Sequence, residues 1–159
     1  MKKIFLLVAI VATAFVQNSF AQDKGTKAQT DQLLTLYFNI KDALVSGNAS
    51  VAATKSAEFV KTANELDANT PSEESRDALI NTAGDISKTT DIKKQREYFS
   101  GFSDQMFAFA KTTKLSTEPI YKAYCPMKKA SWLSKEAAIK NPYYGSAMLT
   151  CGKVVETLK

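Results

Sequence analysis

Residues 91–112 read DIKKQREYFSGFSDQMFAFAKT, and this stretch decides the fold. Four large apolar side chains recur in it at alternating spacings of three and four residues, which puts them on one face of a helix: Phe99, Phe102, Met106 and Phe109. An aromatic stripe of this kind is far more often core than the wall of a ligand pocket. We therefore predict an amphipathic helix from Asp91 to Thr112 with a buried aromatic face.

Three more helices are predicted before this one. An apolar face runs from Thr30 to Ser46 and ends at Gly47. An alanine-rich segment over 50–68 suits close packing between helices. Thr70, Pro71 and Glu73 then form a helix start, with a cap, a first-turn proline and a capping-box glutamate. Four helices with short connections predict an all-α protein, an antiparallel bundle.

The helical pattern is lost after residue 113. Residues 118–124 are short, aromatic and suited to extended structure, and Trp132 leads into a short helical piece around Ile139. The sequence NPYYG at 141–145 is a turn signal, and a final short helix is expected over 146–159. We predict one domain over 22–159, made of a bundle (22–113) and a turn-rich lobe (114–159). Aromatic side chains beside turns usually anchor them, so Trp132, Tyr143 and Tyr144 are expected to cover the join.

The N-terminus has the pattern of a secretory signal. Lys2 and Lys3 precede an apolar run over 4–16, and Ser19-Phe20-Ala21 supplies small residues before a cleavage site. We predict a signal peptide over 1–21 and a periplasmic or secreted mature protein with no transmembrane segment. A retained N-terminal anchor is the alternative that the same pattern leaves open.

Composition limits the chemistry. The chain has no histidine, which excludes the usual catalytic triads and most zinc or copper(II) sites. No Cys-x-x-Cys pair, nucleophile elbow or phosphate loop is present. We therefore expect no enzyme activity, although an enzyme of unknown type stays open as an alternative.

Charge is unevenly distributed along the mature chain. Residues 22–110 carry ten basic and thirteen acidic side chains, whereas residues 111–159 carry nine basic and three acidic ones. The lysines of the basic end are scattered and arginine is absent there, so no nucleic-acid partner is expected. A solvated basic face that touches an acidic partner fits better.

Four sulfur-bearing residues stand in the lobe: Cys125, Met127, Met148 and Cys151. If 125–127 is extended and 146–158 is helical, each Cys/Met pair projects to one side of its segment. Thiolate and thioether are soft ligands that favour copper(I). The alternative is a disulfide between Cys125 and Cys151, which closes a loop of about 25 residues and contributes about 3 kcal/mol in the chain-entropy model. In that case the methionines are core filler.

Several residues are candidates for supporting this site. Pro126 stiffens the first segment, and Pro142 with Gly145 folds the chain back to deliver the second. The complete set of candidate supporting residues is Pro126, Trp132, Asn141, Pro142, Tyr143, Tyr144, Gly145 and Gly152.

The lobe carries the motifs YCPM (124–127), WLS (132–134), IKNPYYG (139–145) and MLTCG (148–152), and KQREYFS stands at 94–100. Together they resemble an uncharacterised bacterial family of exported helical domains, also found joined to periplasmic adaptor subunits of copper/silver-type efflux systems. The resemblance implies a role in heavy-metal handling or efflux, with an efflux adaptor or another periplasmic metal protein as partner. It favours a soft-metal site with a redox-sensitive cysteine pair. The stretch Lys128–Ser131 is shorter and more basic than the glycine-containing linker that the family leads us to expect.

Overall fold

The computed structural model describes residues 18–66, 72–113 and 115–158, and the elements below belong to this part of the chain. Four α-helices are followed by three strands and one short 3₁₀ helix. The elements are α2 (Asn18–Ser46), α3 (Ala49–Asn64), α4 (Glu73–Ser87), α5 (Ile92–Thr112), β1 (Ile120–Cys125), β2 (Ala130–Ser134), η1 (Gly145–Met148) and β3 (Lys153–Leu158). The prediction of an all-α protein is therefore wrong, because the lobe contains a β-sheet.

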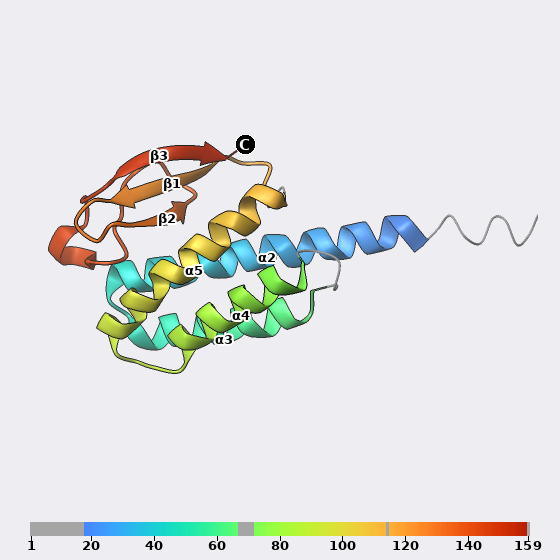
Figure 1. The fold of residues 1–159 in the computed structure, drawn as a ribbon, viewed down its shortest axis with the longest axis horizontal. Coiled ribbons are helices and arrows are strands. Elements are labelled where there is room, and N and C mark those ends of the chain that lie inside the picture. The colour runs from blue at the N-terminus through green and yellow to red at the C-terminus, as the bar shows by residue number, and fades with distance from the viewer. Residues whose placement is uncertain (1–17, 67–71, 114, 159) are drawn as a thin grey trace, which may run out of the picture.

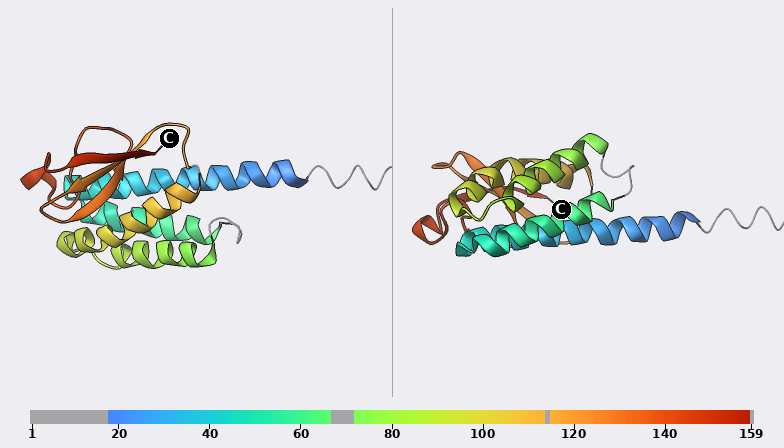
Figure 2. Two further views of the ribbon diagram at one scale, coloured as in Figure 1. Left: turned by 45° about the horizontal axis from the view of Figure 1, so that its top comes forward. Right: turned by 90° about the horizontal axis from the view of Figure 1, so that it is seen from below.

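The helices form an antiparallel bundle in which each helix packs on the next in the chain (Figure 1). The sheet covers the side of the bundle formed by α2 and α5, while α3 and α4 lie on the opposite side (Figure 2). β2 packs against α5, and η1 lies at the C-terminal end of α2. The molecule thus has three layers, with α2 and α5 in the middle one.

Helix α5 confirms the strongest pattern in the sequence. The Asp91 carboxylate caps it by accepting hydrogen bonds from the backbone N–H groups of Lys93 (2.9 Å) and Lys94 (3.4 Å). Its aromatic stripe is buried as predicted, facing the other helices and the sheet. The stripe stacks with Tyr37 of α2, whose ring centroid lies 5.5 Å from that of Phe99.

The predicted start of the third helix is shifted. Ser72, not Thr70, is the N-cap of α4, and its hydroxyl accepts from the Ser75 N–H at 3.4 Å. Thr70 and Pro71 themselves lie outside the described residues. Glu73 is the first residue of the helix, where its charge is favourable to the helix dipole.

The sheet has the order β2-β1-β3 and is antiparallel throughout. Cys125 pairs with Ala130 at the β1–β2 turn, and a bulge between Lys122 and Ala123 interrupts the pairing with β3. β2 is almost wholly buried, whereas β3 is an exposed edge strand. The two edges of the sheet therefore differ in their access to solvent.

Two helical predictions in the lobe are wrong. The segment predicted as a final helix is η1 followed by β3, and Trp132 lies in a strand, with bends rather than a helix after it. For the C-terminal segment, β1 supplies backbone hydrogen-bond partners to β3 from about 30 residues earlier in the chain, whereas residues 135–138 after β2 form bends without pairing to β1. Val154 and Val155 are β-branched and suit this extended pairing.

The predicted signal peptide lies largely outside the described residues, which begin at 18. Its expected cleavage point, after Ala21, falls within the first turns of α2 in the unprocessed chain. Among the described helices, none combines the length and the apolar character needed to span a membrane.

Candidate functional site

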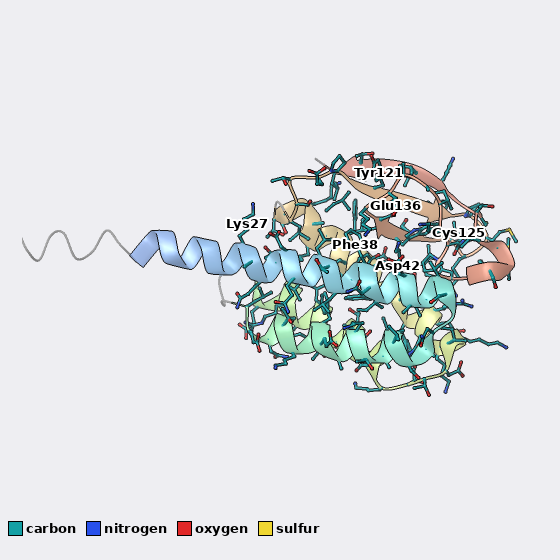
Figure 3. The ribbon with its side chains drawn as sticks, turned by 180° about the vertical axis from the view of Figure 1, so that it is seen from behind. Lys27, Phe38, Asp42, Tyr121, Cys125 and Glu136 are labelled. Carbon is teal, nitrogen blue, oxygen red and sulfur yellow. The ribbon has the colours of Figure 1, made fainter. Side chains whose placement is uncertain are left out.

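Two thiols meet at the end of the sheet. Cys125 is the last residue of β1, and Cys151 lies two residues before β3. Their Sγ atoms are 3.5 Å apart, and both cysteines are free thiols. Cys125 is completely buried and Cys151 is partly exposed, so solutes reach the pair from the Cys151 side. Figure 3 shows Cys125 at the end of the molecule opposite to Lys27.

The β1–β2 turn shapes the Cys125 side of the pair. The Lys129 N–H donates to the Cys125 carbonyl at 2.8 Å, which closes a tight turn over 126–129. Pro126 follows Cys125, where its fixed φ suits a turn. Lys129 adopts φ 57°, in the left-handed region that favours glycine. The extended geometry predicted for 125–127 is therefore wrong, because the chain turns directly after the cysteine.

Asn141 organises the Cys151 side. Its side-chain amide donates to the Cys151 carbonyl at 2.7 Å, and its own backbone N–H donates to the Leu149 carbonyl at 2.8 Å. Its side-chain oxygen accepts from the Tyr143 N–H at 2.8 Å. Asn141 is completely buried, so these bonds hold the loop before Cys151 in one shape. The helical spacing predicted for Met148 and Cys151 is not found, since η1 ends at Met148.

Two glycines allow the close approach of these segments. Gly152 has φ 145°, and a Cβ there would lie 2.8 Å from Trp132 Cη2 and 3.0 Å from the Tyr124 carbonyl oxygen. Gly145 has φ 55°, and a Cβ there would collide with the Arg96 guanidinium. Both positions therefore need glycine, for the conformation and for the space.

The aromatic residues join the lobe to the bundle, as predicted. The Tyr143 ring contacts both Phe99 (5.9 Å between centroids) and Trp132 (6.0 Å), and its hydroxyl donates to the Ser131 carbonyl. Tyr144 packs partly buried against the core, and Pro142 is buried beside it. These contacts hold the cysteine-bearing loop against α5.

The two thiols have different electrostatic surroundings. Burial raises the pKa of Cys125, but hydrogen bonds from the backbone N–H groups of Lys128 and Met127, from the Asn141 amide and from Cys151 outweigh it, so the pKa lies below its ordinary value. The neighbouring Cys125 sulfur, together with burial, raises the pKa of Cys151. Of the two sulfurs, the buried Cys125 is therefore the one whose thiolate form is favoured.

Comparison with known proteins places the helical part in a family. A family model described as a protein of unknown function, DUF3347, matches residues 33–118, which is more than half of the chain. This chain belongs to the DUF3347 family. No curated protein and no solved structure matches it.

The DUF3347 match ends before the sulfur-bearing lobe. It covers α3, α4, α5 and residues 33–46 of α2, and it ends at Glu118, just before β1 begins at Ile120. None of the four sulfur residues lies within it. The family assignment therefore concerns the bundle, and the site in this DUF3347 protein is argued from its own geometry.

The methionines flank the thiols in different ways. Met127 stands in the β1–β2 turn with 65 % of its surface exposed, and Met148 is partly buried at the end of η1. The Cys151 N–H donates to the Met148 carbonyl at 3.1 Å. The structure thus brings the two thiols into contact and places a methionine close in sequence to each.

Other sites in the described residues are weaker candidates for chemistry. No group of three or more His, Cys, Asp or Glu side chains gathers there in a way that could hold a metal ion. A groove of about 340 Å³ follows α2 between Lys27 and Asp42, with Phe38 and Lys135 among its lining residues and neither cysteine among them. Its polar lining residues are mostly exposed.

Sequence reasoning missed two contributors to the site. The backbone N–H groups that contact Cys125 come from residues two and three positions after it, and the Cys-Pro-x-x pattern of a turn is the signal that could have found them. Arg96 was missed as well: its guanidinium donates to the Leu44 carbonyl at 2.8 Å and fills the space beside Gly145. Local sequence carries no signal for that contact, because it joins segments far apart in the chain.

Proposed function

We propose that this DUF3347 protein is an exported, non-catalytic binding protein for a soft metal ion, copper(I), held between Cys125 and Cys151. The observation that carries the proposal is the 3.5 Å contact between the two sulfurs at the end of the sheet. Met127 and Met148 are the proposed additional thioether ligands. The resemblance of the lobe motifs to domains joined to efflux adaptors supports a role in heavy-metal handling.

The spacing of the thiols suits one metal ion. Two metal–sulfur bonds of about 2.3 Å that meet at a tetrahedral angle hold their sulfurs about 3.8 Å apart, close to the observed 3.5 Å. The cysteines therefore need little movement to share an ion. Because the chain has no histidine, thiolate and thioether are its soft donors, and these select copper(I) over harder ions.

The hydrogen bonds to Cys125 favour the form that binds metal. A thiol must lose its proton to become a ligand, so groups that stabilise the thiolate raise metal affinity at a given pH. The N–H groups of Met127 and Lys128 and the Asn141 amide do this for a sulfur that is completely buried. The partly exposed Cys151 is the side from which an ion enters.

The test is a copper(I) competition titration of residues 22–159 against a chromogenic chelator, with the protein reduced or oxidised. We expect one-to-one binding in the reduced form alone. Cys125→Ser and Cys151→Ser are each expected to lower the affinity more than a hundredfold. The Met127→Leu/Met148→Leu double variant is expected to lower it more than tenfold, which corresponds to about 1.4 kcal/mol. Met106→Leu is the matched control, since Met106 is buried in the bundle core.

A second candidate function rests on the same contact. Moving the sulfurs from 3.5 Å to a bond length of about 2.05 Å would make a disulfide, and the protein would then be a cross-linked structural or interaction domain. This candidate predicts no copper binding in either form and a loss of about 3 kcal/mol of stability on reduction. Absence of copper binding by the reduced protein would decide against the metal proposal and in favour of this one.

A further inference from the structure

The surface around the thiols combines exposed apolar side chains with lysines. We define the thiol tip by Met127, Lys128 and Lys129 of the β1–β2 turn, together with Leu149 and Lys153. Lys153 pairs with Tyr124 next to Cys125, and Leu149 lies two residues before Cys151. The contact between the cysteines therefore gathers these residues at the end of the sheet where Cys125 lies (Figure 3).

The tip carries positive charge without local neutralisation. No aspartate or glutamate occurs within 119–135 or within 137–155. Lys128, Lys129 and Lys153 make no ion pair within the described part of the chain. Lysines elsewhere on the surface do pair, as Lys55 does with Glu58 at 2.8 Å. The tip thus combines lysines that form no ion pair among the described residues with flanking sequence that carries no acidic side chain.

Apolar surface lies beside these lysines. Met127 is 65 % exposed and Leu149 is 40 % exposed, and both flank the cysteines in sequence. Lys129 holds φ 57° in the turn, a conformation that a non-glycine residue adopts at a cost and that recurs at functional sites. A positive rim around exposed apolar side chains is the composition of a protein interaction surface.

We infer that the thiol tip docks an acidic partner protein and is the surface through which the soft metal ion passes. The passage of metal rests on the proposed function; the docking rests on charge and exposure. Opposite charges raise the rate of encounter and orient the two partners. A lipid surface fits less well, because membrane-binding faces are rich in aromatic residues, and the exposed apolar side chains of the tip and of the adjoining strand β3 are Met127, Leu149, Val154 and Val155, none of them aromatic.

The test uses the reduced, metal-free protein over residues 22–159 and a synthetic acidic peptide in which methionines alternate with pairs of glutamates. Amide chemical shifts in NMR spectra report binding. We expect shifts confined to the tip, an affinity that falls steeply with added salt, and no response to the same peptide with lysine in place of glutamate. The Lys128→Glu/Lys129→Glu/Lys153→Glu variant should bind the acidic peptide at least tenfold more weakly.

Two further variants distinguish a loss of docking at the tip from a general effect of the substitutions on folding. Lys55→Glu/Lys61→Glu/Lys88→Glu makes the same charge change on α3 and at the end of α4 and should bind like the parent protein. Met127→Gln removes apolar surface without a charge change and should weaken binding. Equal responses to both peptides, or unchanged binding by the tip variant, would overturn the inference. Stronger binding to phosphatidylglycerol vesicles than to the acidic peptide would overturn it in favour of a membrane surface.

The outcomes separate this inference from the proposed function. Copper(I) binding without peptide docking removes the thiol tip as a docking surface and leaves the metal site standing. Peptide docking without copper(I) binding removes the metal site and leaves the thiol tip standing as a docking surface.

Discussion

The Tyr37 hydroxyl joins the bundle to the sheet. It forms a hydrogen bond with Ser103 Oγ at 2.7 Å and accepts from the Leu133 N–H of β2 at 2.9 Å. All three groups are buried, and burial raises the pKa of Tyr37 well above its ordinary value, so the hydroxyl stays neutral. Tyr37 lies within the first predicted helix, but the local sequence carries no information about these partners.

Tyr37→Phe should destabilise the protein by about 1–3 kcal/mol, because it leaves the buried Leu133 N–H without a partner. Urea unfolding followed by circular dichroism measures the change. Tyr98→Phe on the exposed side of α5 is the control and should change stability by less than about 0.5 kcal/mol. Equal stability of both variants would show that the Tyr37 bonds contribute nothing.

The two cysteines should titrate apart when each is left alone. In Cys151→Ser, the N–H donors around Cys125 remain and stabilise its thiolate, so the thiolate should form at a lower pH than in Cys125→Ser. The ultraviolet absorbance of the thiolate measures this. Identical titration curves for the two variants would contradict the electrostatic picture of the site.

The sign of the linked effect on stability follows from the direction of the shift. The folded-state pKa of Cys125 lies below its unfolded value, so the unfolded chain binds more protons between the two values. The stability of Cys151→Ser should therefore rise with pH through this window. The contribution of Cys125 to the free energy of unfolding is fully present above the ordinary pKa of a thiol, and it is lost as pH falls through the pKa of Cys125 in the folded state.

At the scale of elements, the structure of α5 is determined by its own residues, whereas that of β3 depends on a partner strand. α5 has its cap, its apolar period and its helix-forming residues within one continuous segment, so the sequence predicts it to within one residue. β3 has two exposed valines and two charged residues, a pattern that a helix also accommodates. Its hydrogen-bond partners belong to β1, about 30 residues earlier in the chain. For this reason a helix was predicted where the structure has a strand.

Gly152 is the point at which the chain enters β3, and it should not tolerate a side chain. Gly152→Ala should cost about 1–3 kcal/mol, because its φ of 145° and the Trp132 ring 2.8 Å from an added Cβ both oppose the substitution. Thermal unfolding measures the effect. Gly101→Ala is the control within α5, where the nearest atom, Thr82 Cγ2, is 3.9 Å away. There alanine should stabilise the helix by up to about 1 kcal/mol, and a loss of stability in both variants would contradict the prediction.

At the scale of the whole molecule, the bundle and the lobe share one hydrophobic core. Buried residues continue from α5 into the sheet and the following loop, including Ile120, Ala123, Trp132, Leu133 and Tyr143. The DUF3347 match ends at Glu118, on the bundle side of this core. The lobe therefore covers a face of α2 and α5 that would otherwise be exposed to water.

A fragment of residues 22–118 should not form a stable native bundle. This fragment lacks the sheet, so apolar side chains of α2 and α5 become exposed to water. The Tyr37 hydroxyl also loses the hydrogen bond that the Leu133 N–H donates to it. We expect the fragment to show helical circular dichroism without a cooperative thermal transition, whereas residues 22–159 melt in one transition. A cooperative melt of the fragment at the temperature of the longer chain would show that the bundle folds independently of the lobe.

The sequence by itself determined the four-helix bundle, the Asp91 cap, the buried stripe of α5 and the role of Tyr143 in joining lobe to bundle, because periodicity, capping and burial are properties of neighbouring residues. Only the tertiary structure decided the three strands, the Tyr37 bonds and the distance between Cys125 and Cys151. A strand obtains its hydrogen bonds from another segment of the chain. Cys125 ends β1 and Cys151 precedes β3, so these two cysteines, 26 residues apart, meet only after β3 has paired with β1. The motifs singled out four sulfur residues, while the contact between two of them, Cys125 and Cys151, depends on the fold.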